Sequence, residues 1–255
     1  MSTKAEVSSS YLEATKAKYA GACLYPVVAN VLLTGAKNED SIGEAISTSL
    51  INRDHRVTIF PDDVRGDPFG HPSDYNFKGY SALVMCHGVM HLDWFEDMPL
   101  DRAYEIVSVN LLGTIHMVQH FVHETLDTLK RKTIISIGSM AYTKVLNGSA
   151  VYCASKAGAA HLMKCLAWEL APKGYDVYSI HPSNVADTPM ETETITRLAA
   201  YRNLSIPEAT AYWKDGMLRP MLLQKSEITG LVIDLIEGKY PYMSGSNIEL
   251  AGGMR

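Results

Sequence analysis

Tyr152 and Lys156 are the residues whose types and spacing most directly suggest chemistry in this sequence. Four positions apart on a helix, their side chains lie on one face and within reach of each other. A free tyrosine phenol titrates near ~10, which is too high for ready proton exchange at neutral pH. A cation beside the phenol favours the phenolate, and Lys156 can be that cation. The pair predicts an acid–base site, although the same spacing also arises by chance on amphipathic helices.

The elements that must position this pair follow from alternating apolar runs and helical patterns. Short, β-branched runs predict buried strands at 27–33, 56–60, 81–86, 133–137, 176–180 and 246–250. Helical patterns lie between them at 44–53, 99–128, 151–170 and 225–238. Strands alternating with helices predict an α/β fold, a Rossmann-type doubly wound parallel sheet in a single domain.

Around this core the chain divides into three parts. Residues 1–25 form a polar N-terminal leader, and residues 26–255 form the domain. Within the domain, the polar and aromatic stretch at about 186–220 predicts an insertion that covers the substrate.

Composition excludes several classes of partner. The 255 residues are 47% hydrophobic and carry a formal net charge of −5 without a basic run, so we expect no nucleic-acid partner. No apolar run is long enough to span a bilayer, so we expect no membrane segment. The cysteines are scattered without a Cys-x-x-Cys pair, which predicts a reduced, cytoplasmic protein. They are Cys23, Cys86, Cys153 and Cys165.

A small-residue turn follows the first expected strand and leads into a helix. It runs Thr34-Gly35-Ala36-Lys37-Asn38-Glu39-Asp40-Ser41-Ile42-Gly43. Strand, turn and helix in this order can place backbone N–H groups against phosphate oxygens, although an ordinary strand-to-helix loop has the same pattern. Asp62, at the end of the second strand, can bond the hydroxyls of an adenosine ribose or be a solvated turn carboxylate.

Histidines at helical spacing raise the question of a metal. His116, His120 and His123 share one helix, but no carboxylate or cysteine signature accompanies them. We interpret them as a solvated or interface face, and His87 and His91 as structural residues or neighbours of a ligand. No metal site is expected.

The order of these motifs resembles the short-chain dehydrogenase/reductase family from about Val27 to Gly253. The resemblance rests on motifs in the family's order and spacing: Thr34-Gly35…Ile42-Gly43, Asn110, Ser139, Tyr152-x-x-x-Lys156, Pro182-Ser183-x-Val185, Thr188-Pro189 and Gly245…Ala251-Gly252-Gly253. It implies oxidation of a secondary alcohol, or reduction of a ketone, with NAD or NADP. Tyr152 would be the acid–base residue.

Three departures from the family pattern stand out. The glycine turn is lengthened, with Gly35 and Gly43 eight positions apart and Ser41 in place of the middle glycine. This form is similar to a divergent branch with enoyl-thioester reductases, whose wider tyrosine–lysine spacing argues against that reaction here. Cys86-His87-Gly88 stands where Asn-Ala-Gly is usual, and the region after the second strand is too short for the family's usual strand and helix.

The resemblance also implies roles for individual residues. Lys156 would bond the nicotinamide ribose and lower the pKa of Tyr152, and Ser139 would donate to the carbonyl oxygen. Asn110 would hold a helix distortion and a water that links Lys156 to solvent. The expected cofactor-binding residues are Gly35, Lys37, Ser41, Ile42, Gly43, Asp62, His87, Gly88, Tyr152, Lys156, Pro182, Val185 and Thr188.

Several alternatives stay open. Lys37 would favour the 2′-phosphate of NADP, whereas Asp62 would repel it, and we favour NAD. The substrate pocket is expected to be apolar or aromatic, with Tyr201, Tyr212 and Trp213 nearby. Family members often form homodimers or homotetramers. A non-catalytic nucleotide-binding regulator, or an epimerase or dehydratase that retains its cofactor, are the rival functions.

Overall fold

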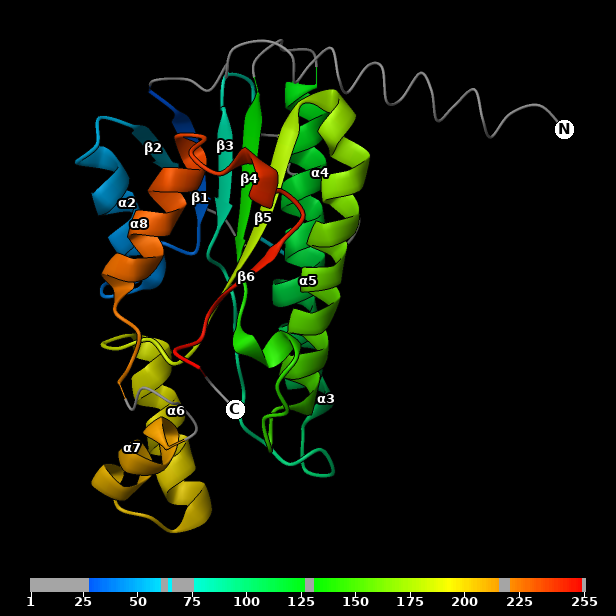
Figure 1. The fold of residues 1–255 in the computed structure, drawn as a ribbon. Coiled ribbons are helices and arrows are strands. Elements are labelled where there is room, and N and C mark those ends of the chain that lie inside the picture. The colour runs from blue at the N-terminus through cyan, green and yellow to red at the C-terminus, as the bar shows by residue number, and fades with distance from the viewer. Residues whose placement is uncertain (1–27, 61–63, 66–75, 127–130, 216–220, 254–255) are drawn as a thin grey trace, which may run out of the picture.

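The centre of the fold is one six-stranded sheet, whose strands run parallel in the order β2-β1-β3-β4-β5-β6 (Figure 1). The computed structural model describes residues 28–60, 64–65, 76–126, 131–215 and 221–253. The strands are β1 (Asn30–Thr34), β2 (Arg56–Ile59), β3 (Ala82–Met85), β4 (Lys132–Ile137), β5 (Tyr175–Pro182) and β6 (Asn247–Leu250). The order reverses between β1 and β3, so the predicted doubly wound parallel sheet is confirmed.

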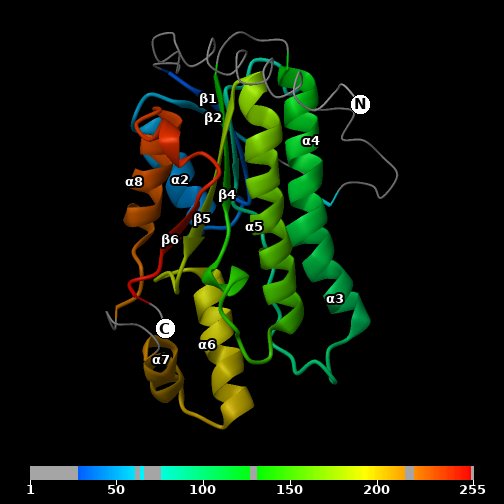
Figure 2. The same ribbon diagram turned by 45° about the vertical axis from the view of Figure 1, so that its right-hand side comes forward.

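Helices cover both faces of the sheet (Figures 1 and 2). On one face lie α2 (Ile42–Ile51) and α8 (Lys225–Ile236). On the other lie α4 (Gly113–Thr125) and α5 (Ala150–Leu170), with α3 (Leu100–Val107) leading into α4. The remaining pair, α6 (Pro189–Arg202) and α7 (Ile206–Lys214), extends beyond one end of the sheet.

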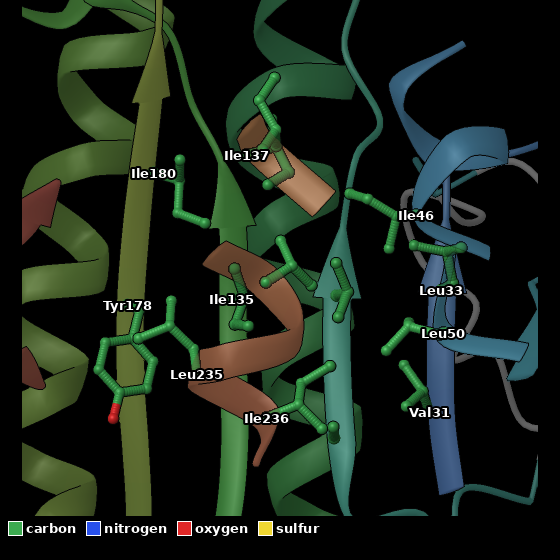
Figure 3. Close-up of a cluster of buried hydrophobic side chains, with 14 of the residues drawn as sticks. Val31, Leu33, Ile46, Leu50, Ile135, Ile137, Tyr178, Ile180, Leu235 and Ile236 are labelled. Carbon is green, nitrogen blue, oxygen red and sulfur yellow. The ribbon is translucent and has the colours of Figure 1, made fainter. Parts of the chain in front are cut away.

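Alternating side chains of each central strand enter two different cores. Val31 and Leu33 of β1 pack in the cluster that contains residues of α2 and α8 (Figure 3), whereas Leu32 packs among residues of α4 and α5. Strands β3, β4 and β5 are buried along their whole length. This double burial is typical of parallel sheets covered on both faces, and it explains the continuous apolar runs in the sequence.

The structure differs from the expected elements in one place. The single helix expected over 99–128 is divided into α3, a π-helical turn at Ser108–Leu112, and α4. In the region after β2 that was expected to be shortened, the described residues 64–65 and 76–81 contain neither helix nor strand, and residues 61–63 and 66–75 lie outside the described residues. The insertion at 186–220 contains α6 and α7, while its residues 216–220 and the leader 1–25 lie outside the described residues.

Two properties of the described residues bear on the kind of site to expect. None of the described helices has both the length and the apolar character needed to cross a bilayer. In the same part of the chain, no three His, Cys, Asp or Glu side chains come together in a way that could hold a metal ion.

Candidate active site

A cleft of about 670 Å³ lies where β1, β3, β4 and β5 reach their carboxyl ends. It is lined by most of the residues that the sequence singled out: Gly35, Lys37, Ser41, Ile42, Gly43, His87, Gly88, Ser139, Tyr152, Pro182, Val185 and Thr188. Asn110 and Lys156 line a smaller inner cavity that shares His87 and Gly138 with the cleft. Asp62 lies outside the described residues. Parallel strands bring these residues together because their carboxyl ends share one edge of the sheet.

The turn after β1 is packed too tightly for any side chain at its glycines. Gly35 has a φ of +70°, and a Cβ there would lie 2.5 Å from the backbone of Cys86 and His87. A Cβ on Gly43 would lie 2.5 Å from the carbonyl oxygen of Gly35. The lengthened turn therefore preserves two close approaches, between β1 and β3 and between the turn and α2.

Two helices begin at this cleft, each with its first turn capped by a cleft residue. The Ser41 hydroxyl accepts a hydrogen bond from the Glu44 N–H at 3.0 Å at the start of α2. The Thr188 hydroxyl accepts one from the Glu191 N–H at 3.2 Å at the start of α6. The caps leave other first-turn N–H groups without helical partners, and such groups attract anions.

Lys225, the first residue of α8, joins the two sides of the cleft. Its ammonium donates to the carbonyl oxygen of Asp40 in the lengthened turn at 2.8 Å and to that of Asp187 at 2.9 Å. Both aspartates have positive φ values, 58° and 54°. A cation in the first turn of a helix opposes the helix dipole, so these two bonds offset an unfavourable location. The sequence offered no signal for this contact, because Lys225 lies 185 residues from Asp40.

His87 bonds inward to the protein rather than presenting both ring nitrogens to the cleft. Its Nδ1 lies 2.7 Å from the Thr34 hydroxyl, and its Nε2 lies 3.3 Å from the Thr114 hydroxyl. Thr114 already donates its proton to the carbonyl oxygen of Asn110, so it accepts from Nε2–H. In the neutral ring Nδ1 then accepts from Thr34. His87, in the Cys86-His87-Gly88 segment that replaces the family's usual Asn-Ala-Gly, thus links the end of β1 to α4.

Asn110 lies in the π-helical turn, where a distortion was expected. Its amide oxygen accepts from the Val89 N–H, and its amide nitrogen donates to the Val89 carbonyl, each at 2.9 Å. The same nitrogen donates to the Ser155 hydroxyl at 3.0 Å. Asn110 is only 2% exposed, and these bonds satisfy its buried amide. It therefore connects the loop after β3 to the helix that carries Tyr152.

The side chains of Ser139, Tyr152 and Lys156 meet beside the loop after β3. The Ser139 hydroxyl accepts from the Ala141 N–H at 3.2 Å, which leaves its proton for the Tyr152 phenol. The Lys156 ammonium lies 5.8 Å from the centre of the Tyr152 ring. A Cβ on Gly88 would be 3.1 Å from that ammonium, so Gly88 provides room for it.

Burial dominates the electrostatics of this group. It raises the pKa of Tyr152 to about 12, with the hydrogen bond from Ser139 opposing the rise. It lowers the pKa of Lys156 to about 8 and raises that of the Cys86 thiol to about 12. The expectation that Lys156 brings the phenol pKa below its usual range is wrong for the protein alone. Both groups are desolvated, which disfavours both charged forms.

The cleft also has lining residues that the sequence did not single out as site residues. They include Met90, Leu146, Asn184, Met190, Thr194 and Trp213. Trp213 was expected near the substrate, but Tyr201 and Tyr212 do not line the cleft. Tyr201 packs on Trp94 and Tyr212 on Arg202. The amphipathic pattern of these helices could not show which aromatic ring faces inward.

Comparison with known proteins connects this geometry to a family. The family profile described as "short chain dehydrogenase" matches residues 74–198. An NADH-dependent L-xylulose reductase of Ambrosiozyma monospora is 30% identical over 182 residues, covering 70% of this chain and 60% of the relative. A vibriobactin-specific 2,3-dihydro-2,3-dihydroxybenzoate dehydrogenase of Vibrio cholerae is 25% identical over 175 residues, covering 69% and 66%. The chain thus spans between 60% and 66% of the length of these two curated relatives.

Solved structures show the same fold. The ligand-free aldohexose dehydrogenase of Thermoplasma acidophilum superposes with a TM-score of 0.77 at 20% identity. The match covers 89% of this chain and 93% of that one. The likeness therefore extends over the sheet and over both helical layers.

Proposed function

Because the chain belongs to the short-chain dehydrogenase/reductase family, we propose that it is an NAD(P)-dependent oxidoreductase that interconverts a secondary alcohol and a ketone. The observation that carries this proposal is the meeting of Ser139 and Tyr152 at the cleft, with Lys156 and Asn110 directly behind them. A protein that only binds nucleotide does not need all four side chains.

The cleft fits a nicotinamide dinucleotide. The pyrophosphate would lie against the turn at Gly35 and Gly43, where no side chain intervenes at either glycine. The first turn of α2 and Lys37 would also hold it. Pro182, Val185 and Thr188 would hold the nicotinamide end, with Ile42, Ser41 and Gly88 between. When bound, the nicotinamide ring supplies or accepts the hydride. We favour NAD over NADP because Asp62 would repel a 2′-phosphate; the NADH-dependent relative supports this choice.

The protein's own residues would move the proton. In reduction, the Tyr152 phenol gives its proton to the carbonyl oxygen, and in oxidation the phenolate takes the hydroxyl proton. The Ser139 hydroxyl donates to the same oxygen as negative charge develops there. The Lys156 ammonium, held beneath Gly88, would bond the nicotinamide ribose and stabilise the phenolate. Asn110 positions Lys156 and Tyr152 through Ser155 and the loop at Val89.

The substrate would enter between the catalytic residues and α6–α7. Met90, Leu146, Met190 and Trp213 favour a molecule with an apolar or aromatic body. From the family resemblance we also propose a cytoplasmic location and a homodimer or homotetramer. The face of α5 around Ala159 and Met163 is not free for that assembly, because both side chains are buried in the core.

The test begins with turnover. Purified protein would be screened with NADH and NADPH against aromatic ketones, aliphatic ketones and ketoses such as L-xylulose. Tyr152→Phe should lower kcat by about 10²–10⁴ because the acid–base group is lost. Tyr212→Phe is the matched control, since that ring packs on Arg202 away from the cleft. Unchanged turnover in Tyr152→Phe would refute the mechanism.

The rival functions give different results. Binding of NADH without turnover of any alcohol or ketone would favour a nucleotide-binding regulator. Cofactor that remains bound through purification, together with catalysis that consumes none of it, would favour an epimerase or dehydratase.

A further inference from the structure

A buried histidine lies behind the serine of the active site. His181 is the seventh residue of β5 and is completely inaccessible to solvent. Its Nδ1 lies 3.2 Å from the carbonyl oxygen of Ser139, and its Nε2 lies 3.2 Å from the side-chain oxygen of Asn247 on β6. The mechanism proposed above does not use this ring.

The space for the ring comes from a glycine directly before Ser139. A Cβ on Gly138 would lie 2.5 Å from His181 Nδ1 and 2.7 Å from Cε1. The φ of Gly138 is not positive, so the position requires glycine for space rather than for backbone conformation. The imidazole thus packs directly against the backbone that presents Ser139.

A second contact holds the turn that follows Ser139. The His181 ring stacks on Tyr142, with ring centres 3.9 Å apart and an angle of 23° between the planes. The Tyr142 hydroxyl donates to Glu249 at 2.6 Å, and Glu249 pairs with His181 in the β5–β6 register. Ser139 caps this same 3₁₀ turn, Met140–Tyr142. His181 therefore touches the serine's segment at its carbonyl and at its third following residue.

The hydrogen-bond partners determine where the ring carries its proton. A carbonyl oxygen only accepts, so Nδ1 must donate to Ser139. Nε2 faces the amide of Asn247, whose NH₂ group can donate to a neutral ring and whose oxygen can accept from a charged one. Burial lowers the pKa of His181, and the Lys156 charge adds to this effect, whereas the bonds to Asn247 and Ser139 and the Glu249 charge oppose it. Tyr142, Glu249 and Lys156 are the titratable groups that act on this ring.

We infer that His181 is a positioning residue that holds the Ser139 carbonyl and the Met140–Tyr142 turn, and thereby aims the Ser139 hydroxyl at Tyr152 and the substrate oxygen. This role rests on the proposed function, because the proposed reaction provides the substrate oxygen that the Ser139 hydroxyl would stabilise. His181 does not line the cleft but lines the inner cavity behind it, so its effect on the reaction would pass through Ser139.

Kinetics of two substitutions test the role. His181→Leu keeps a similar volume but has no donor, so kcat should fall about tenfold or more while the Kd for NADH stays within about threefold. His181→Asn restores a donor near the Nδ1 position and should recover most of kcat. In a Ser139→Ala background, His181→Leu should lower kcat no further. An equal loss in both backgrounds, or unchanged kcat in His181→Leu, would overturn the inference.

A matched control separates positioning from general damage. His55 is also buried and accepts from the Ala29 N–H at 3.0 Å, at the opposite end of the sheet. His55→Asn should leave kcat unchanged even if it lowers the melting temperature. A loss of kcat in His55→Asn as large as in His181→Leu would assign both effects to stability and overturn the role.

An activity-independent measurement distinguishes this inference from the proposed function. In protein labelled with ¹⁵N-histidine, the His181 signals are those missing from the His181→Asn spectrum. We expect a protonated Nδ1 at neutral pH. A ring protonated only at Nε2 would show that His181 does not hold Ser139, whatever the enzyme turns over. If the wild type turns over nothing but Nδ1 is protonated, the proposed function fails while the contact with Ser139 is upheld.

Discussion

At the scale of single residues, the active site contains a cation that burial makes costly. Lys156 is 7% exposed, and among the described residues no carboxylate pairs with it. Burial lowers its pKa from 10.5 to about 8. Between these pH values the unfolded chain binds the proton that the folded protein releases, so stability rises with pH across that window. Below about pH 8 the cost of the buried charge is complete.

Lys156→Met should therefore stabilise the protein while damaging the reaction. At pH 7 we expect a higher melting temperature, from a gain on the order of 1–3 kcal/mol, and the gain should shrink as the pH approaches 10.5. Thermal denaturation at pH 7 and pH 10 measures both effects. Lys239→Met, at a half-exposed lysine at the end of α8, is the control and should show no comparable pH-dependent gain. A destabilised Lys156→Met at pH 7 would mean that the ammonium is better solvated by its surroundings than its burial indicates.

At the scale of elements, the cleft depends on contacts between segments distant in sequence. The lengthened turn, the loop before α6 and the first turn of α8 meet at Lys225. Asp40 lies within the lengthened turn, so the Lys225 bonds tie this turn to the loop before α6. We expect the Lys225 bonds to hold the turn at the right distance from Thr188 for a dinucleotide to fit between them.

Lys225→Met should weaken NADH binding by about tenfold, equal to ~1.4 kcal/mol, which is typical for lost hydrogen bonds to a charged group. The value of kcat at saturating cofactor should change much less. Titration of nicotinamide fluorescence gives the Kd, and Lys239→Met on the same helix region serves again as the comparison. Equal affinities in the wild type and Lys225→Met would show that the turn keeps its position without this contact.

At the scale of the whole molecule, the cofactor should act as a structural ligand as well as a reactant. The cleft is bounded by residues from both halves of the sheet, so a dinucleotide there would contact β1, β3, β4 and β5 at once. Ligand that binds only the folded state adds about 2.7 kcal/mol of stability at a concentration of 100 Kd.

Thermal denaturation with NADH and NADPH would measure this linkage and the choice of cofactor. We expect both to raise the melting temperature, NADH at lower concentration, in line with the proposed preference for NAD. A larger effect of NADPH would assign cofactor choice to Lys37, which lines the cleft. No shift with either compound, in a folded protein, would contradict the cofactor site.

Much of this protein is determined by local sequence. The apolar runs required strands buried on both faces, and the helical patterns between them required parallel connections, so the doubly wound sheet was predictable. The spacing of Tyr152 and Lys156 placed both on one helix face, and Gly35 and Gly43 marked the close turn. These features depend on neighbours in the chain, which periodicity and residue type describe well.

Only the tertiary structure decided what depends on distant neighbours. The bond from Lys225 to Asp40 spans 185 residues, and His181 meets Ser139 across 42. A helix distortion at Asn110 was expected, but its bonds to Val89, 21 residues away, came only from the tertiary structure. The pKa of Tyr152 also went against expectation, because desolvation depends on how completely the surrounding chain buries the phenol and not on its spacing from Lys156.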